Sequence, residues 1–205
     1  MNCIVNDANI NLSEDEEDVL QELINVAHGN ATAVIADILH AFASLSIPKI
    51  KIMQTSELVK QFQKLENASY FFSSQAFVGE FSGESAFFID EVSAHNLAKH
   101  LDVQSMDDLD DALLEINNIL TSSLTSRLAQ EMGTKISFSL PSIAKLNLNE
   151  AAKFEKFQQY SQAIVIDTEL NFKEQQIHAE IFILTEEESI LWMKKQLNSI
   201  LETLT

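Results

Sequence analysis

The chain has 205 residues, a formal net charge of −18 and 46% hydrophobic residues. This length and apolar content suffice to bury a core, which excludes overall disorder. The 31 acidic residues outnumber the 13 basic ones, and this excludes a nucleic-acid-binding protein because phosphate recognition needs clustered Lys and Arg. The same charge disfavours binding to anionic membrane surfaces.

The N-terminal sequence carries no targeting signal. Residues 1–10 contain neither the basic region nor the apolar core of a signal peptide. Cys3 is the one cysteine of the sequence and cannot form an internal disulfide. No apolar run approaches the roughly 20 residues that span a bilayer. We therefore expect a soluble, cytoplasmic protein with no membrane partner.

The first half of the chain is predicted to begin with a long helix. Ser13 with Glu16 three residues later forms a capping box, and about seven helical turns follow. An apolar strand punctuated by serines comes next and ends at Pro48. The rest of this half is predicted as a hairpin and a closing helix: strand Tyr70 to Phe81, a turn at Ser82 and Gly83, strand Ser85 to Ile89, and helix Ala94 to Leu101.

The second half repeats this order. Ser105 and Asp108 form a weaker capping box, the helix runs about seven turns, and Gly133 is its natural stop. A second serine-punctuated strand ends at Pro141. The remaining elements are predicted as two strands and a helix: Gln162 to Phe172, Gln176 to Leu184, and Glu188 to Leu201. Two polar segments fit short helices and loops equally: Leu58 to Asn67 and Asn149 to Gln159.

The two halves are related in sequence. Residues 14–50 align with residues 107–143 without a gap, with about ten identities in 37 positions where chance gives about two. A repeat of this length marks a duplicated unit whose halves bury their faces against one another. We therefore expect one domain over residues 1–205, made of similar halves at about 13–103 and 105–203. The predicted fold class is α/β, in the α+β sense, with a pseudo-two-fold unit of two long helices on antiparallel sheet.

Each long helix has an apolar sector and a polar ridge opposite to it. The residues predicted to face the core are Leu20, Leu23, Ile24, Ala27, Ala31, Val34, Ile35 and Ile38, and Leu113, Ile116, Leu120, Leu124 and Leu128. We define the first ridge as Asp18, Glu22, Asn25, Gly29 and Thr32, and the second ridge as Asp111, Glu115, Asn118, Ser122 and Thr125. The Asp, Glu and Asn are the same in both copies, while the neighbouring pair Gln21 and Leu114 differs. This retention indicates a working surface.

The spacing within each ridge suits a single site. Residues three and four apart on a helix lie about 5 to 6 Å from one another. An asparagine is neither an acid nor a base at neutral pH, but its amide accepts from and donates to one water molecule at once. Placing a hydrolytic water for in-line attack on phosphorus requires such a group. Asn25 and Asn118 are therefore candidate catalytic residues.

The segments Glu22-Leu-Ile-Asn25 and Glu115-Ile-Asn-Asn118 resemble the paired signatures of the CheC, CheX and FliY phosphatases of bacterial chemotaxis. The resemblance extends over nearly the whole chain and includes the Gly83 hairpin and the repeat itself. Two intact copies in 205 residues are most similar to CheC, because CheX is shorter and FliY carries an additional flagellar switch domain.

The resemblance implies dephosphorylation of a CheY-like response regulator. Asn25 and Asn118 would each place the water that attacks the aspartyl phosphate. Glu22 and Glu115 would dock to the active-site lysine of the regulator, since a carboxylate beside a phosphoryl group needs a cation between them. The chain would carry no cofactor of its own, because the Mg²⁺ belongs to the regulator. A CheD-like protein is a second candidate partner.

Other residues of the motif have less defined roles. Asp18 and Asp111 begin the two ridges and are expected to help hold the partner. His28, which follows Ala27, departs from the family pattern, in which both positions are small. A histidine there can crowd the approach of the partner, but it lies about a quarter turn off the ridge, so we expect this site to keep part or all of its activity.

Two other functions remain open at this point. The chain fits a non-catalytic binding module for a receiver domain or a CheD-like partner, and it fits a structural piece of a flagellar switch. Water placement tolerates few side chains, which favours the phosphatase. The five histidines share no metal-ligand spacing and the four glycines are dispersed, so we expect no metal or nucleotide site.

Overall fold

The structure is a computed structural model that describes residues 10–39, 44–46, 49–57, 60, 69–103, 105–147, 162–172, 174–185 and 187–204. The strand end predicted at Pro48, the segment 149–159 and most of the segment 58–67 lie outside the described residues. No helix in the described part of the chain has the length and apolar content needed to traverse a bilayer.

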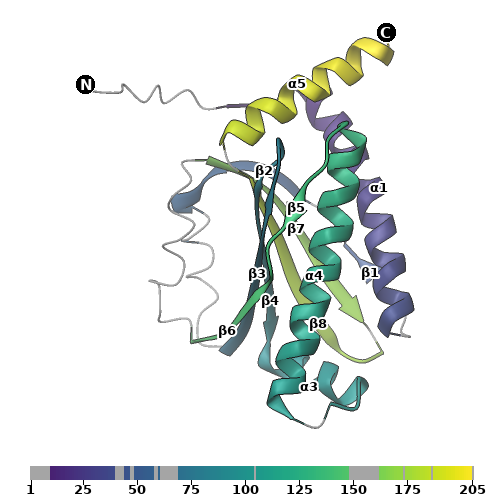
Figure 1. Cartoon of the computed structure of the whole chain (residues 1–205), viewed down its shortest axis with the longest axis vertical. Coiled ribbons are helices and arrows are strands. Elements are labelled where there is room, and N and C mark those ends of the chain that lie inside the picture. The colour runs from purple at the N-terminus through teal and green to yellow at the C-terminus, as the bar shows by residue number, and fades with distance from the viewer. Residues whose placement is uncertain are drawn as a thin grey trace, which may run out of the picture.

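One antiparallel sheet combines strands from both halves of the chain (Figure 1). The strands are β1 (Ser44–Leu45), β2 (Lys49–Gln54), β3 (Ser69–Val78), β4 (Gly83–Asp90), β5 (Ser137–Phe138), β6 (Ser142–Asn147), β7 (Gln162–Phe172) and β8 (Ile177–Thr185). Their order is β1-β7-β8-β4-β3-β5, with β2 also paired to β7 and β6 also paired to β3. The predicted mixture of long helices and antiparallel sheet is confirmed.

The strand order has a pseudo-two-fold arrangement. The central pair consists of β4 from the first half and β8 from the second half. On one side β3 pairs with β6, and on the other side β7 pairs with β2. β7 begins at Gln162, 93 residues after the start of β3 at Ser69, and this spacing equals that between the two ridges. The sequence repeat therefore continues into the sheet.

The two long helices cover one face of this sheet. α1 (Glu14–Leu39) and α4 (Met106–Glu131) lie side by side and antiparallel, while α3 (Glu91–His100) and α5 (Glu187–Leu204) lie at opposite ends of the sheet (Figure 1). Each long helix has 26 residues, which is the predicted length of about seven turns. Both ridges are thereby carried on the same side of the molecule.

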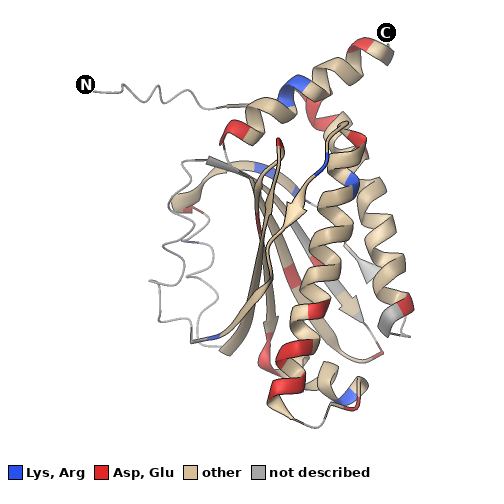
Figure 2. Ribbon diagram, in the orientation of Figure 1, with Lys and Arg blue, Asp and Glu red and all other residues tan. Residues whose placement is uncertain are grey.

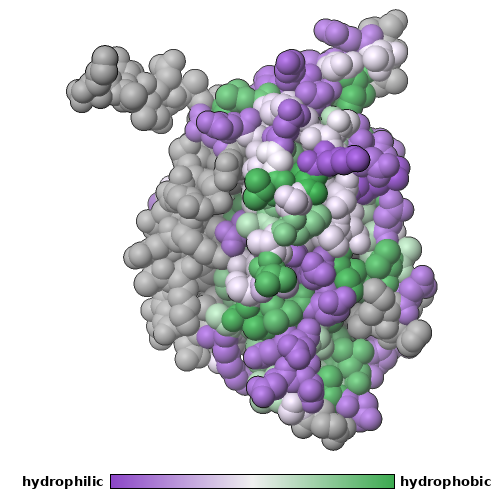
Figure 3. All heavy atoms as spheres, viewed as in Figure 1, coloured by the Kyte–Doolittle hydropathy of each residue, from purple (hydrophilic) through white to green (hydrophobic). Residues whose placement is uncertain are grey.

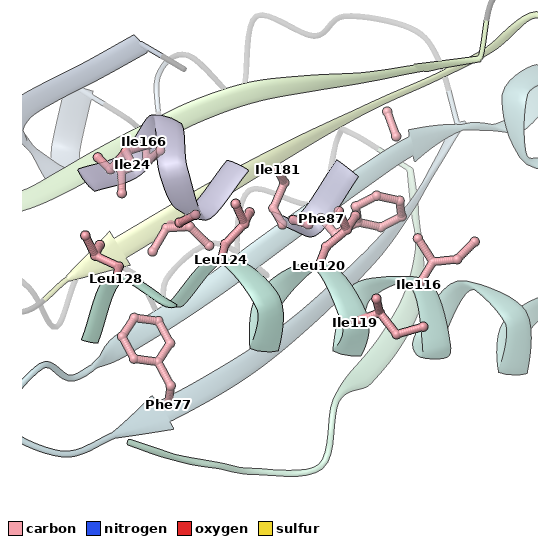
Figure 4. Packing of buried hydrophobic residues seen from close by; sticks show 14 of the residues in the cluster. Ile24, Phe77, Phe87, Ile116, Ile119, Leu120, Leu124, Leu128, Ile166 and Ile181 are labelled. Carbon is pink, nitrogen blue, oxygen red and sulfur yellow. The ribbon is translucent and has the colours of Figure 1, made fainter. Parts of the chain in front are cut away.

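The apolar sectors of α1 and α4 form the core with the sheet beneath them. Figure 4 shows Leu120, Leu124 and Leu128 of α4 packed close to Ile24 of α1 and Ile181 of β8. Each such side chain contributes about 1.5–3 kcal/mol when it is fully buried. All five inward residues predicted for α4 are buried. This packing fixes the rotation of each helix about its axis.

In α1 the predicted inward sector is largely confirmed. Leu20, Ile24, Ala27, Ala31 and Ile35 are buried, and Leu23 is partly buried against the same cluster. Val34 is 39% exposed, so its predicted inward position is wrong. It lies at the edge of the apolar sector, where a small change in helix rotation exposes a side chain.

The ends of the long helices follow the predicted signals. Asp108 N–H donates to the Ser105 hydroxyl (3.1 Å) at the start of α4. At its end Gly133 has φ of 77°, and the N–H groups of Gly133 and Thr134 donate to the carbonyls of Gln130 (3.0 Å) and Ala129 (2.9 Å). This is a Schellman motif, for which glycine in the left-handed region is the preferred residue.

Two sequence expectations about the strands are wrong. The strand after α4 does not end at Pro141, because pairing with β3 resumes at Ser142 in β6. β5 and β6 form an edge of the sheet, and an edge tolerates a proline that would interrupt a central strand. The first hairpin turns over residues 79–82, so Phe81 lies in the turn, where it is fully buried against Phe77.

Glu16 ties the start of α1 to α5. Its carboxylate is 3% exposed and accepts from Ser13 N–H (2.7 Å), from the Asn198 amide (2.7 Å) and from Lys194 Nζ (3.2 Å). Burial raises the pKa of Glu16, but the hydrogen bonds from Ser13, Asn198 and Lys194 outweigh it and hold the pKa below its ordinary value of 4.5. The ionised side chain is therefore the stabilising form.

We expect Glu16→Gln to lower the free energy of unfolding by about 2–3 kcal/mol at neutral pH, because a buried, hydrogen-bonded carboxylate is lost. Asp108→Asn, at the exposed capping box of α4, is the matched control and should cost less than about 1 kcal/mol. Urea denaturation measures both. A carboxyl group whose pKa is lowered in the folded protein stabilises the fold at pH values above its ordinary pKa. The difference in unfolding free energy between wild type and Glu16→Gln should therefore shrink as the pH falls below about 4.5. A gap independent of pH contradicts this assignment.

Candidate functional site

The first ridge lies on the outer face of α1. Asp18, Glu22, Asn25 and Gly29 are exposed, and Thr32 is half-buried. A β-carbon at Gly29 would meet no atom within 4 Å, so the surface beside Asn25 is open. The outward orientation that the helical period predicts for this ridge is thus observed.

The second ridge lies on α4 and turns inward at its C-terminal end. Asp111 and Glu115 are exposed, and Asn118 and Ser122 are half-buried. Thr125 is 1% exposed, so its predicted outward position is wrong. Its hydroxyl donates to the carbonyl of residue 121 one turn earlier (2.6 Å), which satisfies the polar group beside α1.

The ridge carboxylates have no partner in the described part of the protein. Neither Asp18 and Glu22 nor Asp111 and Glu115 make a hydrogen bond or an ion pair with any residue that the structure describes. Figure 2 shows acidic residues at the start of α1 and along the N-terminal half of α4, and Figure 3 shows hydrophilic side chains over the same part of α4. These carboxylates are therefore available to a cation on another molecule.

Among the residues that the structure describes, the side chain of Asn25 has one hydrogen-bond partner, and this partner is on its own helix. The side-chain amide of Gln21, one turn earlier, donates from Nε2 to Asn25 Oδ1 at 3.1 Å. Both side chains are on the surface, where such a pair on one helix contributes only about 0.2–0.5 kcal/mol. The amide of Asn25 is therefore weakly held.

Asn118 is held from beneath by the sheet. Gln75 of β3 is 2% exposed, and its Nε2 donates both to Asn118 Oδ1 (2.8 Å) and to the Ser139 carbonyl (2.9 Å). No further bond to Asn118 is found among the described residues, so one lone pair of Oδ1 and both N–H groups of Nδ2 remain available. This amide is held in place and still able to bind a water molecule.

A buried polar cluster lies behind Asn118. The Thr121 hydroxyl hydrogen-bonds with the Ser85 hydroxyl (2.6 Å) and donates to Asn117 Oδ1 (3.2 Å). Asn117, Thr121 and Ser85 are all fully buried. Two buried atoms of the cluster, Gln75 Oε1 and Asn117 Nδ2, have no partner among the described residues. A buried polar group that is left without a partner costs about 1–3 kcal/mol, whereas an apolar side chain in its place carries no such cost.

At the equivalent positions of the Asn25 site, different residues take the place of this cluster. The helix positions of Asn117 and Thr121 are taken by Ile24 and His28, 93 residues earlier. In the sheet Gln75 faces Ser85 across β3 and β4, whereas Thr168 faces Ile181 across β7 and β8. The two ridges are alike on their outer side and different underneath.

His28 does not lie on the exposed surface of the first ridge. It is 7% exposed, and burial lowers its pKa from 6.5 to about 4, so it is neutral at physiological pH. Because the His28 side chain is buried, it does not crowd a partner at the surface of the first ridge.

The ridges form a surface and not a pocket. An open cleft near the C-terminal end of α4 is lined by Gly79, Glu80, Ser126, Gln130, Gly133, Thr134, Lys135 and Ile136, and these include no ridge residue. Among the described residues, no three His, Cys, Asp or Glu side chains gather as a metal site. Small-molecule sites are concave, so an outward helix face favours a macromolecular partner.

The sequence reasoning missed Gln75 and Ser139. Gln75 lies in a strand rich in phenylalanine, with Phe71 and Phe72 before it and Phe77 after it. It is on the same face of the strand as Phe71 and Phe77, which pack in the core beneath the helices. A glutamine at an inward strand position is the signal that was available, since buried amides need partners. Which partner it meets depends on the pairing of β3 with α4, and the sequence does not give that pairing.

This chain is similar to known proteins in its structure. No family model and no curated protein matches the sequence. Among solved structures, FliY from Thermotoga maritima aligns over 93% of this chain and 99% of its own, with a TM-score of 0.74 and 15% identity. The FliM middle domain from H. pylori aligns over 90% of this chain and 99% of its own, with a TM-score of 0.58 and 13% identity. CheX from Desulfovibrio desulfuricans aligns over 80% of this chain and 99% of its own, with a TM-score of 0.53 and 14% identity.

The chain has the CheC/CheX/FliY fold. The resemblance seen in the two motifs is confirmed at the level of architecture. At this identity the CheC/CheX/FliY fold is what the alignments show, and the FliM middle domain shares it. Because one fold hosts several functions, activity must be argued from the ridges.

The burial of neutral His28 is expected to make the folding stability fall in acid. The unfolded chain takes up a proton near pH 6.5 and the folded chain near pH 4, so stability falls as the pH is lowered between these values, by on the order of 3 kcal/mol. His28→Thr places the residue of the second copy at this position and should remove that part of the pH dependence. Urea midpoints at about pH 7 and pH 4.5 test this, and equal pH dependence in both proteins contradicts it.

Proposed function

We propose that this protein is a phosphatase that hydrolyses the aspartyl phosphate of a CheY-like response regulator. Asn25 and Asn118 are the water-placing residues of two sites, and Glu22 and Glu115 dock the regulator. Asp18 and Asp111 extend the docking surface by one turn. The proposal rests on one feature of both ridges: an exposed carboxylate with no partner among the described residues, one turn before an asparagine amide that faces outward.

The chemistry asks little of the protein beyond placement. The oxygen of the water forms a bond to phosphorus as the bond from phosphorus to the aspartate oxygen breaks, and the proton of the water passes to phosphate or solvent. An amide whose oxygen accepts a hydrogen bond from the water and whose N–H donates one to a neighbouring oxygen holds the water in line. Catalysis then comes from orientation, and no acid or base of this chain is required.

Charge decides how the partner approaches. This acidic protein would repel a phosphoryl group unless cations lie between them. The lysine of a response-regulator active site supplies one such cation and pairs with Glu22 or Glu115. The Mg²⁺ that the regulator carries supplies the other, so the chain needs no metal site of its own.

A docking role without hydrolysis is the second candidate. The alignment with FliM middle domains, including the one in a FliM–SpeE complex from H. pylori at a TM-score of 0.62, favours it, because those alignments cover about as much of the chain as that with FliY does. The same surface also fits a CheD-like partner. Docking alone needs polar and charged side chains, but it does not need an amide whose oxygen is fixed from beneath. We therefore prefer the phosphatase.

The decay of a phosphorylated response regulator measures the proposed activity. Wild type should accelerate decay, and Asn25→Ala with Asn118→Ala together should abolish the acceleration, because each alanine removes the water-placing group. Asn30→Ala, an exposed asparagine on α1 that is not on the ridge, is the matched control and should leave the rate unchanged. If wild type binds the regulator without changing its decay, docking replaces catalysis as the function.

Binding of the regulator should depend on the ridge glutamates. Glu22→Gln and Glu115→Gln together should weaken binding by about 3- to 10-fold at low salt, because a carboxylate that meets a lysine at a protein surface is lost. The loss should shrink at high ionic strength, where screening weakens the wild-type contact. Calorimetry at two salt concentrations measures this. Affinity that is unchanged at low salt contradicts the docking role of these residues.

A further inference from the structure

The orientation of the Asn118 amide is set by a backbone carbonyl. The Ser139 carbonyl can only accept a hydrogen bond, so Gln75 must present its Nε2 group on that side (2.9 Å). The second hydrogen of the same nitrogen then points to Asn118, and Asn118 Oδ1 must accept this hydrogen bond (2.8 Å). The order of nitrogen and oxygen is thereby defined in both amides, and Asn118 Nδ2 is turned away from Gln75.

The Ser139 carbonyl is itself held by the sheet. Ser139 N–H donates to the Ala76 carbonyl (3.0 Å), and Ala76 N–H donates to the Ser139 hydroxyl (3.1 Å). Gln75 directly precedes Ala76, so its backbone is held in β3 while the carbonyl that its side chain binds is held at the edge strand. Its side chain has little freedom to rotate, since it is 2% exposed.

The Asn25 site keeps the anchoring serine but has no counterpart of the glutamine. Ser46 N–H donates to the Glu169 carbonyl (2.9 Å), and Glu169 N–H donates to the Ser46 hydroxyl (2.9 Å), which repeats the bonds of Ser139. The residue before Glu169 is Thr168, which takes the position that Gln75 has in the Asn118 site. Within the described part of the chain, the Asn25 side chain instead accepts its hydrogen bond from Gln21 on the surface of its own helix.

We propose that Gln75 is a positioning residue that pre-organises Asn118, and that the two sites are unequal because the Asn25 site has no equivalent of it. This inference rests on the proposed function. Gln75 is too deeply buried to touch a docked partner, so it acts only through the Asn118 amide. The buried polar cluster behind Asn118 fits this role, and the equivalent helix positions of the Asn25 site are Ile24 and His28.

Variants that keep only one of the two sites distinguish a positioning role of Gln75 from a general effect on folding. Asn25→Ala leaves only the Asn118 site, and Asn118→Ala leaves only the Asn25 site. Gln75→Met should lower the rate of regulator dephosphorylation about 10-fold or more in the first background and less than about 2-fold in the second. The maximal rate should fall while the regulator concentration at half-maximal rate stays the same, because the docking surface is intact.

A general loss of structure would instead lower the rate of both single-site proteins. Equal effects of Gln75→Met in the two backgrounds, or no effect in the Asn25→Ala background, would overturn the proposal. A changed half-saturating concentration with an unchanged maximal rate would overturn it as well, since it would assign Gln75 to binding.

Nuclear magnetic relaxation of the side-chain amides gives a readout without any activity. In wild type the Asn118 NH₂ group should be rigid and the Asn25 NH₂ group mobile, and Gln75→Met should make Asn118 mobile without changing Asn25. An Asn118 amide that stays rigid in Gln75→Met overturns the positioning role. If no protein accelerates decay, the phosphatase proposal fails, and relaxation still decides the role of Gln75.

Discussion

The antiparallel packing of α1 and α4 across one sheet face is the constraint on which the rest of the structure depends. Once Leu20, Ile24 and their counterparts on α4 are buried, the helical period leaves no choice about which residues face outward. Both acidic ridges are then presented on the same side of the molecule as convex surfaces. A duplicated unit therefore gives a duplicated surface, and the helices need no loop or lid to display it.

The duplication also shows where the two halves have diverged. The Asp, Glu and Asn of the ridges are identical in both copies, and the strand-anchoring serines Ser46 and Ser139 make equivalent hydrogen bonds. The layer between helix and sheet is not equivalent, because the Asn118 side contains a polar cluster and the Asn25 side contains Ile24 and a neutral, buried His28. Divergence beneath a retained surface is expected when one site keeps a demand for precise geometry that the other has lost.

The sequence was sufficient for whatever depends on a single helix or a single cap. The capping boxes, the Gly133 stop, the helix lengths and the outward ridge positions as far as Ser122 follow from local chemistry and the period of the helix. Thr125, Pro141 and Gln75 could not be placed in this way. Their environments are set by the neighbouring helix, by an edge strand that resumes after a proline, and by contact between strand and helix across 43 residues of sequence. Tertiary contacts decide these positions, and local patterns do not report them.

The most direct test of the account is the structure of this protein bound to a response regulator whose active-site aspartate carries beryllofluoride, a mimic of the aspartyl phosphate. The account predicts that a ridge faces the modified aspartate, with Glu115 or Glu22 against the regulator lysine and the amide of Asn118 or Asn25 within hydrogen-bond distance of a water in line with the beryllium. A regulator docked on another face, or on a ridge with its modified aspartate far from both amides, would contradict the account.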